Sequence, residues 1–92
     1  MSIAETAVQN ALRNPNGLEI AEAAAHDALV DRRYREERAW REQNGCGQFL
    51  TAAGYARMNR YVDRLMESAP EAIAYYAIRD ARRKFAAIGG AA

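Results

Sequence analysis

Cys46 and His26 are the side chains with the greatest potential for covalent or acid–base chemistry. Each is the only residue of its type in the 92-residue chain. A cysteine becomes a strong nucleophile when a neighbouring histidine takes its proton. The two residues lie far apart in the sequence, and nothing in the glycine-flanked turn around Cys46 indicates that they meet. We therefore expect an incidental thiol and a structural histidine, with no catalytic residues and no enzyme activity.

The sequence contains no motif for a metal ion or a cofactor. A single cysteine excludes both an intrachain disulfide and a zinc site built from several cysteines. His26 has no partner at the Glu-x-x-His or His-x-x-x-His spacing that places two metal ligands on one helix face. A glycine-rich phosphate loop would follow a strand, and no segment alternates as a strand does. We expect neither metal nor cofactor.

Composition and charge limit the classes of partner. The 13 basic and 12 acidic side chains give a formal net charge of +1, so no overall field favours nucleic acid or an anionic membrane. No apolar run approaches the roughly 20 residues of a membrane span, and the N-terminus lacks a signal-peptide pattern. A lone cysteine suits a reducing compartment. We expect a cytoplasmic protein that does not associate with membranes.

An arginine stripe is the first feature that points to binding. It consists of Arg57, Arg60 and Arg64, with Asn59 and Tyr61 beside it. One interpretation is a helix laid along phosphates, with Asn59 and an arginine reaching base edges in the major groove. The other is the solvated side of an amphipathic helix, partly neutralised by the acidic residues Asp63 and Glu67. The missing basic excess argues against a DNA-binding domain.

An aromatic pair in a charged segment is the second such feature. Residues 31–43 carry nine charges in thirteen positions, yet they include Tyr34 and the only tryptophan, Trp40. Tryptophan, tyrosine and arginine are typical energetic anchors of protein interfaces. A predicted partner-binding surface therefore consists of Tyr34, Arg38, Trp40 and Arg41. Alternatively, Trp40 caps the helical bundle near Phe49, and both interpretations stay open.

Helical periodicity and capping signals place these residues in an all-α fold. We predict one domain over residues 1–92, a small bundle of about four helices at about 3–13, 18–43, 51–67 and 70–88. Ser2, Thr51 and Ser68 are candidate N-caps, and Gly45 suits the left-handed position after the second helix. Gly54 inside the third helix suggests a close helix crossing. The first helix is short, the second is long, and the third and fourth form a tight hairpin.

Two apolar stripes support that hairpin. The first consists of Tyr55, Met58, Val62 and Leu65, and the second of Ala74, Ala77, Ala81, Phe85 and Ile88, with Ile73 and Ile78 at its margins. Because the turn between the helices is short, we expect the stripes to face each other. The bulky apolar set is small for a chain of this size. A core completed by self-association, as a homo-oligomer, or by a partner stays open beside a self-sufficient monomer.

Ion pairs one helical turn apart should keep the charged segment helical in water. The predicted pairs are Asp31–Arg35, Arg32–Glu36, Arg33–Glu37, Glu37–Arg41 and Arg38–Glu42.

The leading functional hypothesis is a small non-enzymatic protein that acts by binding a protein partner, alone or within a nucleoprotein complex. An adaptor fits, as does an inhibitor of a host complex of the kind that mobile elements encode. The alternative is a DNA- or RNA-binding regulator that uses the arginine stripe.

Overall fold

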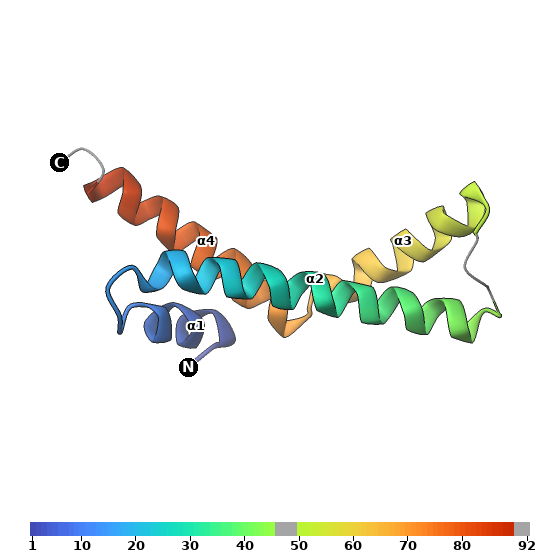
Figure 1. The fold of residues 1–92 in the computed structure, drawn as a ribbon, viewed down its shortest axis with the longest axis horizontal. Coiled ribbons are helices and arrows are strands. Elements are labelled where there is room, and N and C mark those ends of the chain that lie inside the picture. Colours follow the sequence, from blue (N-terminus) through green and yellow to red (C-terminus); the bar gives the residue numbers. More distant parts are fainter. Residues whose placement is uncertain (46–49, 90–92) are drawn as a thin grey trace.

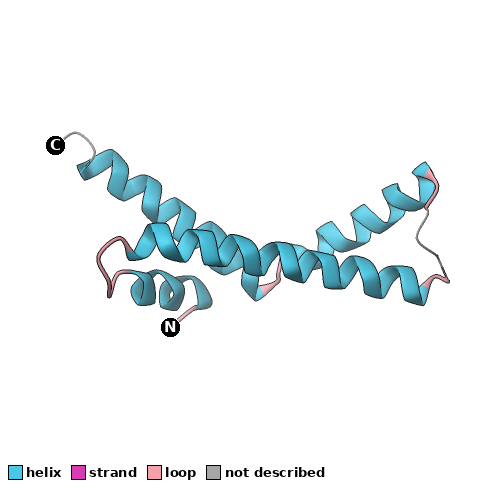
Figure 2. Cartoon of the chain, in the orientation of Figure 1, coloured by secondary structure: helices cyan, strands magenta, loops and turns pink. Residues whose placement is uncertain are grey.

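The computed structural model describes residues 1–45 and 50–89, and these residues form four α-helices without a strand (Figures 1 and 2). The helices are α1 (Ile3–Ala11), α2 (Gly17–Gln43), α3 (Ala52–Met66) and α4 (Pro70–Gly89). The all-α prediction, with a short first and a long second helix, is confirmed. Within the described residues, none of the helices combines the length and apolar character needed to cross a lipid bilayer.

Local capping chemistry explains several helix ends. The Ser2 and Thr51 hydroxyls accept hydrogen bonds at 3.1 Å from the backbone N–H groups of Glu5 and Gly54, as predicted for N-caps. Gly45 follows α2 with a φ of +65°, which confirms the predicted left-handed position. These ends are defined by residues close in sequence, so they are the features that sequence reasoning recovers best.

Helix α4 starts at the predicted residue, but its predicted N-cap is wrong. The helix begins at Pro70, so the residue before it is Ala69, whose carbonyl accepts the Ile73 N–H at 3.1 Å. Ser68 is therefore not the N-cap. The Glu71 carboxylate in the first turn of α4 lies 3.4 Å from the Arg32 guanidinium of α2.

The long helix α2 is the common packing partner of α3 and α4. Side-chain contacts join Arg33 to Asp63 on α3 and Arg82 to Glu22 near the other end of α2. Helices α3 and α4 thus run end to end along α2, antiparallel to it, and diverge from the turn between them (Figure 1). The turn is tight, as predicted, but the expectation that the two apolar stripes face each other is wrong. Met58 and Val62 of the first stripe pack in the cluster that contains Trp40 of α2, whereas Ala77 and Ala81 of the second stripe lie beside α1.

The hydrophobic core lies where α2, α3 and the start of α4 meet. It consists of Trp40, Met58, Val62, Met66, Ala69 and Ala72, with Leu29 and Leu50 packed against it. The buried positions of α3 recur every four residues and include Gly54, so the buried face is rotated from the predicted stripe. Met58 and Val62 are buried as predicted, whereas Tyr55 is 41% exposed and Leu65 is only half-buried.

Two glycines mark close approaches of the chain to itself. A Cβ at Gly17 would lie 1.7 Å from the Ala11 carbonyl oxygen, so only glycine allows the end of α1 to abut the start of α2. A Cβ at Gly54 would meet the Thr51 hydroxyl at 3.3 Å and the Leu50 side chain at 3.6 Å. The segment preceding α3, rather than the predicted helix crossing, therefore explains the second glycine.

The molecule is elongated and open. Its radius of gyration is 16.7 Å and its extents are 53 × 27 × 18 Å. A compact chain of this length has a radius of gyration of about 12 Å. The accessible surface is 6654 Å², against about 5,300 Å² for a typical monomer of this mass. Phe85, predicted to face the core, is 52% exposed.

Replacing Trp40 with alanine is expected to lower the free energy of unfolding by about 3–5 kcal/mol, because Trp40 is 8% exposed and lies in the core. Tyr34→Ala is the matched control on the same helix and should change it by less than about 0.5 kcal/mol, since Tyr34 is 64% exposed. Urea unfolding followed by helical circular dichroism measures both. Equal stability of the two variants would contradict this placement of Trp40.

Candidate functional site

Trp40 does not belong to an exposed binding surface. Its side chain packs with Met58, Val62 and Met66, on the side of α2 that faces α3. Of the charged residues near Trp40 in sequence, Arg38 and Glu42 are exposed. The prediction that Trp40 contacts a partner directly is therefore wrong. Phe49, its predicted neighbour, lies outside the described residues.

Arg41 belongs to the contact between α2 and α3. Its guanidinium carbon lies 5.7 Å from the centre of the Tyr55 ring, within the range of a cation–π interaction. Its Nε atom is buried and has no hydrogen-bond partner in the described part of the chain. Arg41 is only partly exposed, so the Tyr55 ring limits its availability to a partner.

Tyr34 and Arg38 remain exposed and define the first candidate surface. They line a shallow depression of about 610 Å³ whose other members are Ala28, Asp31, Arg35 and Glu71, and we call this set the Tyr34 surface. Tyr34 is 64% exposed. The Arg35 guanidinium lies 3.8 Å from the Glu71 carboxylate, which links the depression to the start of α4.

The second candidate surface is an arginine face on α3. Arg57, Arg60 and Arg64 are exposed, and none of them forms an ion pair within residues 1–45 and 50–89. Tyr61, 46% exposed, lies beside them. We call these four residues the α3 arginine face. At about 100° per residue they share one flank of the helix.

Asn59 lies on the opposite flank of α3. Its side-chain oxygen is 3.5 Å from the Arg33 guanidinium of α2, at the limit of a hydrogen bond. The structure therefore does not bring Asn59 together with Arg57, Arg60 and Arg64. A helical ligand site cannot use both flanks at once, so the predicted combination of Asn59 with these arginines is corrected.

Arg33 forms a contact between α2 and α3 that sequence reasoning missed. It donates to Asp63 at 2.8 Å and to Glu37 at 3.1 Å. The hydrogen bond to Asp63 raises the pKa of Arg33, supported by the negative charges of Asp63 and Glu37 and opposed by desolvation. Asp63 was expected to neutralise the arginine stripe, but it is directed to α2 instead. No local pattern in the sequence identifies this contact, because it joins two helices.

The basic residues of α4 do not extend the α3 arginine face. The guanidinium carbon of Arg79 lies 4.7 Å from the ring centre of Tyr76. Arg82 pairs with Glu22 and Glu19 of α2, and the hydrogen bond that Arg82 donates to the Glu22 carboxylate raises the pKa of Arg82. Both side chains thus serve contacts within the fold.

His26 has an acidic and an aromatic neighbour. His26 is exposed, lies 3.8 Å from the Asp27 carboxylate and meets the Tyr75 ring edge-on at 5.7 Å between centres. Cys46 lies outside the described residues. Among the residues that the structure describes, no group of three cysteine, histidine or acidic side chains could hold a metal ion.

Two of the predicted intrahelical ion pairs form. Arg32 and Glu36 approach to 3.0 Å, and Arg33 and Glu37 to 3.1 Å. Both pairs lie in the middle of α2, where the same arginines also reach α3 or α4. The other three predicted pairs do not form. Arg35 lies near Glu71 and Glu37 pairs with Arg33 instead, and exposed ion pairs gain little stability.

The Arg33–Asp63 contact is expected to show a coupling energy of about 0.2–1 kcal/mol in a double-mutant cycle of Arg33→Met and Asp63→Asn. The value is small because both side chains are partly solvated. Urea unfolding of the single and double variants gives the coupling. A control cycle of Arg57→Met with Asp63→Asn should give a value near zero. Equal coupling in the two cycles would contradict the contact.

Of the predicted site residues, those that remain exposed therefore lie in two sets, the Tyr34 surface and the α3 arginine face. No protein-family model, curated protein or solved structure matches this chain.

Proposed function

We propose that this chain is a small non-enzymatic protein that acts by binding a protein partner through the Tyr34 surface. The observation that carries the proposal is the placement of Tyr34, 64% exposed beside the exposed Arg38 over a shallow depression. Tyr34 is the most exposed aromatic side chain among the residues that the structure describes. Tyrosine and arginine together are enriched at the energetic centres of protein interfaces.

The charges of the Tyr34 surface define the kind of partner. Asp31 and Glu71 supply negative charge, and Arg35 and Arg38 supply positive charge. Arg35 is already held near Glu71, at 3.8 Å, whereas Arg38 forms no ion pair with any residue that the structure describes. A partner surface with an apolar patch for Tyr34 and a carboxylate for Arg38 would match this arrangement.

The proposal includes the role of an adaptor or an inhibitor in the cytoplasm, for example a mobile-element-encoded inhibitor of a host complex. A small chain with a thin core and a large exposed surface fits such a role, because its work is contact rather than catalysis. The lone histidine lies exposed on α2, and the lone cysteine suits a reducing compartment.

A second candidate function is DNA or RNA binding through the α3 arginine face. The observation that favours it is that Asp63 pairs with Arg33 of α2, which leaves Arg57, Arg60 and Arg64 without an acidic partner in the described residues. Three such cations on one helix flank, with Tyr61 beside them, can follow a phosphate backbone and stack on a base.

A pair of matched double variants tests the proposal. The double variant Tyr34→Ala with Arg38→Ala removes from α2 an exposed tyrosine and an exposed arginine that are one helical turn from each other. Tyr61→Ala with Arg57→Ala removes the same side chains at the same spacing from α3. We expect the first variant, and not the second, to lose its host protein partner in affinity purification with quantitative mass spectrometry. Binding of the identified partner, repeated with purified proteins, should weaken at least tenfold.

The same variants separate the two functions. Binding to labelled duplex DNA and structured RNA is measured across a salt series. Binding that weakens steeply with salt and is lost only in Tyr61→Ala with Arg57→Ala would support the second function. Loss of a protein partner in that variant, with retention in the Tyr34 and Arg38 variant, would contradict the proposed use of the Tyr34 surface.

A further inference from the structure

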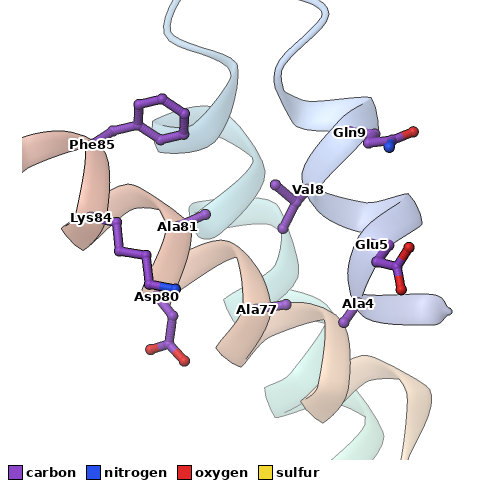
Figure 3. A pocket seen from close by; sticks show the side chains of 9 residues that line it. All are labelled: Ala4, Glu5, Val8, Gln9, Ala77, Asp80, Ala81, Lys84 and Phe85. Atoms are coloured by element: carbon purple, nitrogen blue, oxygen red, sulfur yellow. The ribbon is translucent and has the colours of Figure 1, made fainter.

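An apolar hollow of the described surface lies between α1 and α4, away from both candidate surfaces (Figure 3). This α1–α4 groove has a volume of about 600 Å³. Its apolar lining consists of Ala4, Val8, Ala77, Ala81 and Phe85, and its polar rim of Glu5, Gln9, Asp80 and Lys84. Phe85 stands at one end of the groove, 52% exposed, and does not fill it.

The surface of the chain is large enough to contain an interface. Its 6654 Å² exceed the area of a typical monomer of this mass by roughly 1,300 Å². A stable interface of standard size buries about 800 Å² on each partner. The exposed apolar side chains at this end of the molecule include Ile3 and Phe85. The excess over the whole molecule is large enough for one standard interface.

We propose that the occupant of the α1–α4 groove is a second copy of this chain, bound through α4 about a two-fold axis at Ala81. In an antiparallel pair centred there, Phe85 of each copy lies opposite Ala77 of the other. The large side chain then enters the hollow lined by Ala4 and Val8. Ala77, Ala81 and Phe85 form a ridge of residues four apart, and small residues at its centre let two such ridges approach closely.

The charges on the rim of α4 complement each other in this arrangement. Asp80 of one copy and Lys84 of the other are offset by about 3 Å along the helix axis, well within the reach of their side chains. Lys84 forms no ion pair in the described part of the chain, and Asp80 lies 3.8 Å from Arg79. Because of the two-fold symmetry, the dimer contains two equivalent Asp80–Lys84 pairs.

Self-complementarity of the surface favours a second copy over a foreign helix. The knob, Phe85, and the hole beside Ala77 lie on the same helix, so the surface is complementary to itself, as a two-fold interface requires. The inference does not depend on the proposed function, because the Tyr34 surface lies elsewhere. Self-association can therefore fail while partner binding holds, and the reverse.

Light scattering across a concentration series tests the proposal with the full chain. We expect a mass twice the 10.2 kDa of one chain. Ala81→Glu should weaken dimerisation at least tenfold, and Ala24→Glu, at an exposed alanine of α2, should leave it unchanged. Circular dichroism checks that each variant is folded. A wild-type chain that stays monomeric at hundreds of micromolar, or equal effects of both substitutions, would overturn the proposal.

Charge exchange tests the register without altering the core. Asp80→Lys alone and Lys84→Asp alone place like charges opposite each other, so each should be monomeric where the wild type is dimeric. An equal mixture of the two variants should recover a dimer, because the altered rims are again complementary. Failure of the mixture to associate, or dimerisation of either single variant as strong as that of the wild type, would overturn this register.

Discussion

The packing of α3 on the Trp40 side of α2 is the contact on which the rest of the structure depends. Neither α1 nor α3 is long enough to be a stable helix in water by itself, so each requires a packed face. Trp40 supplies the largest buried side chain of α2, and Met58 and Val62 meet it from α3. Because α2 is long, α3 covers only one half of it, and α1 and α4 cover the other. This division of one helix among three partners produces the elongated shape.

The packing of α3 and α4 along α2 also determines which charged side chains form ion pairs between helices. Arg33 and Arg32 lie near the middle of α2, where they reach Asp63 of α3 and Glu71 of α4. Asp63 and Glu71 are thereby paired with α2. The arginines on the outer flank of α3 are left without acidic partners in the described residues. A nearly neutral sequence thus folds into a surface that is not uniformly neutral, which composition alone does not predict.

Helix ends were predictable from the sequence, whereas packing partners were not. Ser2, Thr51 and Gly45 act on backbone groups a few residues away, so their roles follow from local chemistry. An apolar stripe shows which side of a helix is buried, but not which helix covers it, and the short turn before Pro70 favoured the wrong neighbour. The burial of Trp40 could not be decided for the same reason, because the charged residues around it in sequence do not show which helix covers it. The placement of Asn59 opposite the arginines could have been predicted from helical geometry alone.

Fluorescence of Trp40 tests the central claim most directly, because it is the only tryptophan in the chain. The emission of the native protein should be shifted to shorter wavelength than that of the unfolded chain, with weak quenching by iodide. During urea unfolding, the emission should change together with the helical circular dichroism signal. Emission already like that of the unfolded chain, or strong iodide quenching while the helices remain intact, would contradict a fold organised around this contact.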